Sequence, residues 1–192
     1  MIYYNKDFPQ LLTTKYILDP NTKQRMIDTV LSQRNSANYY GGYTFKVTDQ
    51  YGDFKKIFNF FLDSVTTVFG RLTLSPRHKS WCWANVYNKD DFKTNIHDHQ
   101  HSCSINSVFY LKMPAGISAT EGGLAIANGE ELFSIFQPAE GDLIIMPSTV
   151  AHEPQSHSST DTRIAINMEI TTEDHYSSYY TLENIYANAR AQ

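Results

Sequence analysis

Three histidines and an aspartate are concentrated near the middle of the chain. Residues 95–101 read N-I-H-D-H-Q-H, and a further histidine, His152, ends the later segment P-S-T-V-A-H. In an extended strand, residues i and i+2 project to the same side. The spacing therefore predicts that His97 and His99 face one way and Asp98 the other. With His152 as a distant partner, these imidazoles are candidates for three ligands of one metal ion.

Such a ligand set would suit oxidative chemistry. Three protein ligands on one side of a metal leave positions open for a cosubstrate and dioxygen, as non-haem Fe(II) oxygenases require. Neutral imidazole binds iron, zinc, copper and nickel alike, so the residue types alone do not fix the metal. The opposing interpretation is a solvated polar loop, and we favour it for His78, His157 and His175, which stand isolated in polar sequence.

The second half of the chain must hold these residues, and its pattern is that of short strands. Apolar and aromatic residues alternate or run together in short segments separated by glycine and proline, as in P-A-E-G at 138–141. Regular short strands of this kind are typical of an antiparallel sandwich or jelly roll. The predicted strands cover residues 81–87, 107–113, 123–126, 132–137, 142–146 and 163–170.

The first part of the chain predicts two helices that would cover a sheet. One spans 21–34, after Asp19-Pro20, and the other starts at Asp53 as its N-cap and stops at Gly70. The second helix carries an apolar stripe, which needs a sheet face as its partner. Between the helices, residues 43–47 alternate like a strand.

Together these elements predict a mainly β fold, a double-stranded β-helix (jelly roll or cupin-like) buttressed by N-terminal α-helices. We expect a single domain, with a helical buttress and flanking strands over 1–78, a jelly-roll core over 79–172 and a C-terminal tail over 173–192. Within the tail, residues 181–190 form a further candidate helix.

Composition excludes several classes of partner. The chain has 192 residues, 41% of them hydrophobic, with a net charge of -4. An acidic protein without a basic face is not expected to bind nucleic acid or an anionic membrane. The N-terminus lacks a secretory signal, no apolar run approaches a membrane span, and two cysteines give no disulfide framework. The sequence therefore favours a reducing cytoplasm and leaves the oligomeric state undecided.

The order of these motifs resembles the 2-oxoglutarate- and Fe(II)-dependent oxygenase superfamily, in particular a small bacterial and phage branch with an H-x-H…H…R pattern. The resemblance covers about residues 81 to 170. It rests on Trp83, Asn85, Asn95, His97, His99, Ser107, Phe109, Tyr110, Leu111, Gly141, Asp142, Leu143, Pro147, Ser148, His152, Arg163, Ile166 and Asn167. The implied location is the cytoplasm of a bacterium or of the host of a phage.

The resemblance implies that His97 and His152 bind Fe(II). The superfamily's usual second ligand is a carboxylate two residues after the first histidine, and this chain has His99 there. We favour a three-histidine set of His97, His99 and His152. Two alternatives stay open: a local bulge could turn Asp98 inward, or His101 could serve together with His99. The distinction matters because a carboxylate cancels one positive charge of the metal and an imidazole does not.

The resemblance also implies a cosubstrate site. Arg163, eleven residues after His152, would pair with the distal carboxylate of 2-oxoglutarate, with Tyr110 as a second donor and Asn95 nearby. Alternatively, Arg163 lies at the rim and pairs with Asp161 or Glu169. The implied reaction uses O2 to convert 2-oxoglutarate to succinate and CO2 while a substrate is hydroxylated. Loops 89–94 and 156–162 are the candidates for substrate contacts.

Two other functions remain open from the sequence. A cupin-like metal-dependent enzyme that does not use 2-oxoglutarate would suit three histidines, although Arg163 argues against it. A non-catalytic jelly-roll structural or binding protein would make the histidines incidental. Metal content separates the second from the enzymes, and 2-oxoglutarate binding separates the two enzymes. The substrate, whether a small molecule or a peptidyl residue, is not indicated by the sequence.

Overall fold

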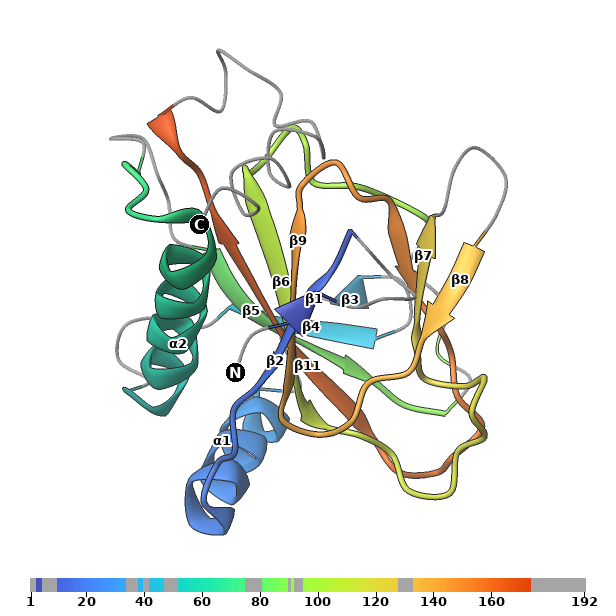
Figure 1. The fold of residues 1–192 in the computed structure, drawn as a ribbon. Coiled ribbons are helices and arrows are strands. Elements are labelled where there is room, and N and C mark those ends of the chain that lie inside the picture. Colours follow the sequence, from blue (N-terminus) through green and yellow to red (C-terminus); the bar gives the residue numbers. More distant parts are fainter. Residues whose placement is uncertain are drawn as a thin grey trace.

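The computed structural model describes residues 3–4, 10–33, 38–39, 42–46, 52–74, 81–89, 91, 95–127 and 133–173. Within these residues, helices and strands alternate in the first part of the chain, and only strands follow α2 (Figure 1). The elements are β1 (Tyr3–Tyr4), β2 (Leu12–Lys15), α1 (Pro20–Ser32), β3 (Asn38–Tyr39), β4 (Gly42–Lys46), α2 (Gly52–Phe69), β5 (Trp81–Tyr87), β6 (Ile105–Lys112), β7 (Leu124–Ala127), β8 (Phe133–Phe136), β9 (Asp142–Pro147), β10 (His152–Pro154) and β11 (Arg163–Ile170).

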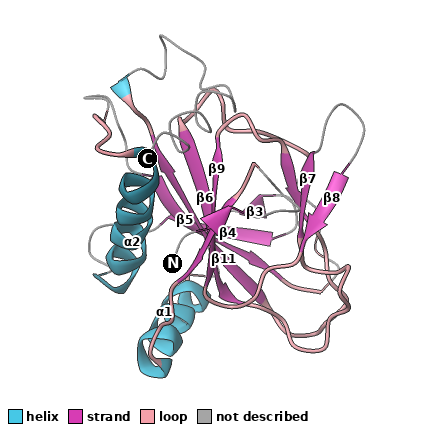
Figure 2. Ribbon diagram, in the orientation of Figure 1, coloured by secondary structure: helices cyan, strands magenta, loops and turns pink. Residues whose placement is uncertain are grey.

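The strands form two antiparallel sheets. The large sheet has the order β1-β2-β9-β6-β11-β5-β4-β3, and the small sheet has the order β10-β7-β8. Figure 2 shows the two helices on one side of the large sheet and the small sheet on the other. The prediction of a mainly β jelly roll with helices packed against it is confirmed.

Each face of the large sheet has its own apolar layer, as the alternation along its strands requires. On β11, Ile164, Ile166 and Met168 pack with the helices, whereas Ala165 faces the small sheet. The helix-side layer also holds Met26, Val30, Phe54, Ile57, Phe61, Val65, Phe109, Leu143 and Ile145. The layer between the sheets holds Val108, Tyr110, Leu124, Ile126, Phe136, Ile144, Met146 and Val150.

Local signals explain where the helices begin and end. Asp19 caps α1 by accepting a hydrogen bond from the Thr22 amide at 2.9 Å, with Pro20 in the first turn. Gly70 ends α2 as predicted, with a positive φ of 76°. The prediction of Asp53 as N-cap was wrong, because α2 begins at Gly52. Asp53 instead lies in the first turn, where Arg25 and Lys56 both pair with its carboxylate.

The N-terminal part contributes strands as well as helices. β2 pairs with β9, and β4, near the predicted strand at 43–47, pairs with β5. The short β2 and the three-residue β10 have no strong sequence pattern and were not predicted. The candidate helix at 181–190 lies outside the described residues, as do His78 and His175.

The turn before β9 provides a test of the fold. Gly141 has φ +84°, and a Cβ there would lie 2.8 Å from the backbone oxygen of Tyr16. We expect Gly141→Ala to lower the free energy of unfolding by about 1–3 kcal/mol. Gly116→Ala is the matched control, because Gly116 has φ +73° with nothing within 4 Å. Urea unfolding should show the larger loss for Gly141→Ala, and equal losses would exclude a role for the Tyr16 contact.

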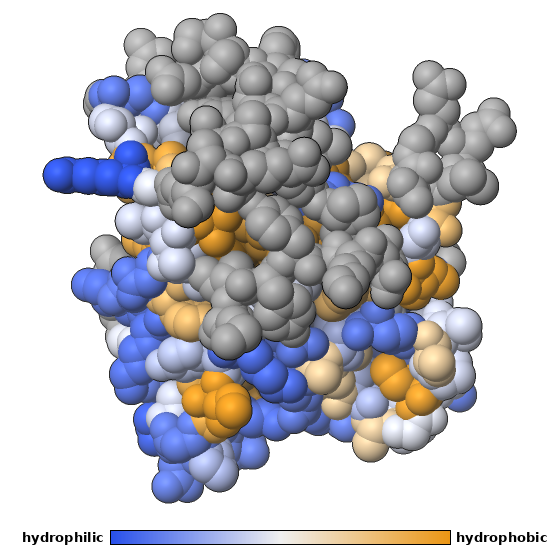
Figure 3. All heavy atoms as spheres, viewed as in Figure 1, coloured by the Kyte–Doolittle hydropathy of each residue, from blue (hydrophilic) through white to orange (hydrophobic). Residues whose placement is uncertain are grey.

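Surface apolar residues are scattered rather than gathered on the face seen in Figure 3, where hydrophilic residues separate small hydrophobic areas. Among the described residues, Ile17, Phe133 and Ile135 are the most exposed examples apart from Ile96 at the site described below. Single exposed apolar residues are normal in globular proteins. None of the described helices is both long and apolar enough to cross a membrane.

Candidate metal centre and cosubstrate pocket

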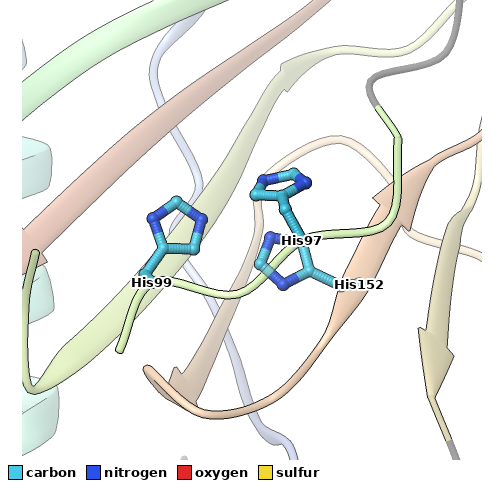
Figure 4. Close-up of side chains that lie close together, drawn as sticks. All are labelled: His97, His99 and His152. Carbon is cyan, nitrogen blue, oxygen red and sulfur yellow. The ribbon is translucent and has the colours of Figure 1, made fainter. Parts of the chain in front are cut away.

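His97, His99 and His152 converge at one end of the space between the two sheets (Figure 4). His97 and His152 are held together by a backbone bridge, with N–H to O distances of 3.1 and 2.9 Å. The His99 amide donates to Ser148 O at 2.7 Å. The ring centroids of His97, His99 and His152 lie 4.7 to 5.2 Å apart. The histidine segment is therefore extended and attached to β10 by one bridge, rather than part of a regular strand.

The hydrogen bonds of the three rings fix which nitrogen is free. Nδ1 of His97 lies 2.8 Å from Asn95 O, and Nδ1 of His152 lies 2.9 Å from Val150 O. Nδ1 of His99 lies 2.5 Å from a carboxylate oxygen of Glu169. A backbone carbonyl can only accept, so Nδ1 of His97 and of His152 carries the proton and Nε2 of each ring has an open lone pair. The carboxylate beside Nδ1 of His99 favours the same tautomer. That tautomer is the one required of a histidine that binds metal through Nε2.

The two alternative ligands lie elsewhere. The Asp98 carboxylate accepts hydrogen bonds from the Gln100 amide and side chain, both at 3.1 Å. His101 is exposed. Two groups of described residues place three potential ligand atoms within 4.8 Å of one another, and neither group includes Asp98 or His101. The arrangement thus favours the three-histidine set over Asp98 or His101.

Burial lowers the pKa of two of the three imidazoles. Desolvation lowers the pKa of His152 to about 3, and it also lowers the pKa of His97. Both rings are therefore neutral at physiological pH, which is the form that binds a metal ion. The neighbouring imidazoles act in the same direction, because His99 disfavours protonation of His97 and both disfavour protonation of His152.

Glu169 contacts the histidine cluster, a position that the sequence interpretation did not assign to it. It is buried on β11 and bonds His99 rather than Arg163. Ser102 Oγ also donates to the same carboxylate oxygen at 3.2 Å. Cys103 lies beside this carboxylate, and burial followed by the negative charge of Glu169 raises the pKa of its thiol. The alternation along β11 is the signal that places Glu169 on the cavity face.

A cavity of about 490 Å³ extends from the three histidines between the two sheets. Strands β5, β6 and β11 of the large sheet and β7 and β10 of the small sheet provide its walls. Its lining is mostly aromatic, apolar or amide-bearing: Trp83, Asn85, Tyr87, Asn95, Ile96, Val108, Tyr110, Leu124, Pro154, Arg163, Ala165 and Asn167 join the three histidines. A concave, mostly apolar space with a few polar groups is the usual form of a small-molecule site.

Arg163 supplies the charge of this cavity. Its side chain is 2% exposed, and Nη1 donates to the carbonyls of Gly122, Gly123 and Gln155 at 2.8 to 3.3 Å. The guanidinium also lies 4.5 Å from the centre of the Tyr87 ring. Within the described part of the chain, Arg163 forms no ion pair and its Nε has no hydrogen-bond partner. The alternative of a rim arginine paired with Asp161 or Glu169 is wrong, since these acids pair with Lys112 and His99.

The other predicted cosubstrate residues differ in position. Tyr110 is buried, lines the cavity, and has a raised pKa because of desolvation, so its phenol stays protonated and can donate. Asn95 is exposed at the cavity mouth, where its backbone oxygen accepts from His97. The interpretation of His157 as a solvated residue was wrong. It is 2% exposed, and its Nε2 lies 3.2 Å from Tyr87 O.

The predicted substrate loops contribute little that can be described. Residues 90 and 92–94 lie outside the described residues, and neither Lys89 nor Asp91 is among the lining residues. The segment 156–162 also does not line the cavity. Ser158 and Asp161 there bond Glu121 and Lys112 instead.

Comparison with known proteins agrees with this chemistry. Residues 81–169 match the family described as putative 2OG-Fe(II) oxygenase. The jelly-roll region of this chain is thus similar to the 2-oxoglutarate- and Fe(II)-dependent oxygenases. The match spans β5 to β11 and so includes the three histidines, Glu169 and Arg163. No curated protein matches the sequence.

Solved structures share the oxygenase fold at low identity. A prolyl-4-hydroxylase from Pseudomonas putida is 15% identical with a TM-score of 0.63, covering 85% of this chain and 92% of its own. A prolyl hydroxylase from Trichoplax adhaerens, in complex with a hypoxia inducible factor peptide, is 16% identical with a TM-score of 0.65, covering 88% and 86%. HygX from Streptomyces hygroscopicus, with nickel and 2-oxoglutarate bound, is 9% identical with a TM-score of 0.62, covering 85% and 82%.

Proposed function

We propose that this chain is a 2-oxoglutarate- and Fe(II)-dependent hydroxylase whose Fe(II) is held by His97, His99 and His152. In the same proposal Arg163, assisted by Tyr110, binds the distal carboxylate of 2-oxoglutarate. Carbon dioxide and succinate are the cosubstrate's products. The hydroxylated substrate is a small molecule or a peptidyl residue.

One observation carries this assignment. A single cavity holds three open imidazole lone pairs and, in its wall, a buried guanidinium with no carboxylate partner among the described residues. Burying an unpaired cation is energetically costly, so we expect such a group to bind an anionic ligand. A molecule that chelates a metal through one end and carries a carboxylate at the other satisfies both features, and 2-oxoglutarate is such a molecule.

The residues fit the expected metal. Three imidazole nitrogen donors from one side leave further positions free, which is the requirement of an Fe(II) oxygenase site. When bound, Fe(II) would supply the activation of dioxygen that organic side chains cannot provide.

The protein's own residues bind, orient and exclude water. Arg163 holds a carboxylate in a fixed direction, because three backbone carbonyls fix its Nη1. Tyr110 adds a neutral donor from β6, the strand next to β11. Val108, Leu124 and Ala165 provide apolar walls, which would limit the access of water to a bound ligand.

The cavity mouth bears on the substrate class. Asn95 and Ile96 are its exposed residues, and Asn167 offers a buried amide Nδ2 without a partner among the described residues. No acidic side chain is among the lining residues. This supports a substrate that is uncharged around its reacting carbon, a condition that peptide segments and neutral metabolites both meet. The free Cys82 and Cys103 support action in a reducing cytoplasm.

The proposal is tested by binding under anaerobic conditions. Adding Fe(II) and then 2-oxoglutarate to the purified protein should produce the visible charge-transfer band of the chelated complex. Succinate, which lacks the keto oxygen, is the control and should give no band. Iron binding without a band would favour a cupin-like enzyme that does not use 2-oxoglutarate. Absence of metal binding would overturn the site assignment.

A further inference from the structure

We infer that Glu169 is a positioning residue that gives the metal centre, through His99, the negative charge that a carboxylate ligand would give directly. This inference rests on the proposed function, since it takes His99 as a ligand. It concerns the place where the chain departs from the superfamily's usual ligand pattern, and it explains how the departure is compensated.

The buried location of Glu169 favours a positive charge nearby. The residue is 5% exposed, and its Oε1 lies 2.5 Å from His99 Nδ1. Among the described residues, neither a lysine nor an arginine pairs with this carboxylate. A buried carboxylate is costly unless it is paired, hydrogen-bonded or close to a metal ion. A divalent cation on the opposite nitrogen of the same imidazole would provide that compensation.

The fold fixes this contact from both sides. Glu169 lies on β11, between Asn106 of β6 and Trp81 of β5 in register. A turn after His99, closed by hydrogen bonds from the Ser102 and Cys103 amides to His99 O, brings the Ser102 hydroxyl onto the same carboxylate. Ring and carboxylate are thus held by separate elements, and their distance does not depend on a flexible exposed side chain.

The three ring partners are unequal, which singles out His99. His97 and His152 donate to neutral backbone carbonyls, whereas His99 donates to a carboxylate. A hydrogen bond to a charged acceptor increases the electron density of the ring and makes Nε2 a stronger donor. His99 is also the residue at the position where the superfamily usually has its carboxylate ligand. The negative charge is therefore retained but lies one imidazole farther from the metal.

Metal titration of the apoprotein tests the inference without any turnover. Cobalt(II) is added anaerobically to wild type and to Glu169→Gln, and its visible absorption is followed. Glutamine keeps the size and the acceptor oxygen but removes the charge. We expect the Kd for Co(II) to rise about 10- to 100-fold. The matched control is Glu153→Gln. Glu153 lies on β10 between His152 and Pro154, which line the cavity, but does not line the cavity itself. We expect the Kd for Co(II) to change less than about threefold in this variant.

Two further variants separate charge from structure. Glu169→Asp keeps the charge and should bind Co(II) more tightly than Glu169→Gln. The double variant His99→Asp with Glu169→Gln returns a carboxylate directly to the metal and should bind at least about tenfold more tightly than Glu169→Gln alone. Thermal unfolding of each apoprotein identifies variants that lose the fold.

The outcomes distinguish the two levels of the argument. Wild type that binds no Co(II) overturns the proposed function itself. Wild-type affinity in Glu169→Gln overturns the role of Glu169 while leaving the histidine site intact. The same holds if Glu153→Gln is weakened equally, or if neither charge-retaining variant exceeds Glu169→Gln. Weaker binding in Glu169→Gln with recovery in the charge-retaining variants supports the inference.

Discussion

Replacing Arg163 with methionine is expected to weaken 2-oxoglutarate binding by about 30- to 3000-fold while Fe(II) affinity changes little. Losing one partner of a buried charge pair costs about 2–5 kcal/mol, and each 1.4 kcal/mol is a factor of about ten. Arg163 is 2% exposed and lies in the cavity wall with only neutral partners among the described residues, so the anion would lose its one strong contact. The charge-transfer band, followed at increasing 2-oxoglutarate concentration, measures the change.

Arg163 has a second role that the experiment must separate. Its Nη1 bonds three carbonyls, so Arg163→Met also lowers the stability of the fold. Fe(II) affinity and thermal unfolding, recorded on the same sample, show whether the site survives. Lys112→Met removes a neighbouring cation that pairs with Asp161 at the surface and should leave the 2-oxoglutarate affinity unchanged. Unchanged affinity in a folded Arg163→Met would limit Arg163 to binding the loop carbonyls.

His152→Ala is expected to remove the chelate band and to weaken Fe(II) binding by more than about 100-fold. Loss of a residue that only hydrogen-bonds a metal ligand typically costs about 10- to 100-fold in affinity, so loss of a ligand should cost more. His152 is 4% exposed, and its neutral ring faces His97 and His99 at centroid distances of 4.7 and 5.2 Å. Anaerobic metal titration provides the measurement.

Two histidines serve as controls for this loss. His101→Ala removes an exposed ring from the same sequence cluster, and His157→Ala removes a buried ring that bonds Tyr87 O. Both variants should bind Fe(II) as wild type does. Weak binding in His101→Ala would restore the alternative in which His101 serves together with His99. A matching loss in Asp98→Asn would restore the carboxylate alternative.

The large elements were predictable because their patterns are long. Residues 163–170 alternate without interruption and form β11 with those bounds, and the apolar stripe of α2 has the period of a helix. Short elements carry too few residues for a period to be seen, which is why β2 and β10 were missed. The N-cap prediction at Asp53 failed because a residue that suits a helix cap also suits the first turn, where two basic side chains bind it.

The candidate site was partly predictable for a similar reason. The spacing of His97 and His99 is local and predicts that the rings share a side, and they do converge, although one backbone bridge holds them rather than a strand. The contact of His99 with Glu169 joins residues 70 positions apart. It depends on the register of β11 against β6 and on the turn after His99. No local sequence pattern predicts this register or this turn. The three backbone carbonyls that accept hydrogen bonds from Arg163 could not be predicted from a local pattern either.

The position of β11 between β5 and β6 has a consequence for synthesis on the ribosome. β2 is made some 130 residues before β9, its partner on the inner side of the sheet, and at about 5–20 residues per second it waits roughly 6 to 26 seconds for that strand. The middle of the large sheet closes only after residue 170 has been added. His99 therefore meets Glu169 only once β11 is in place, so we expect metal loading to follow chain elongation. Nascent chains stalled before residue 163 should not retain the metal.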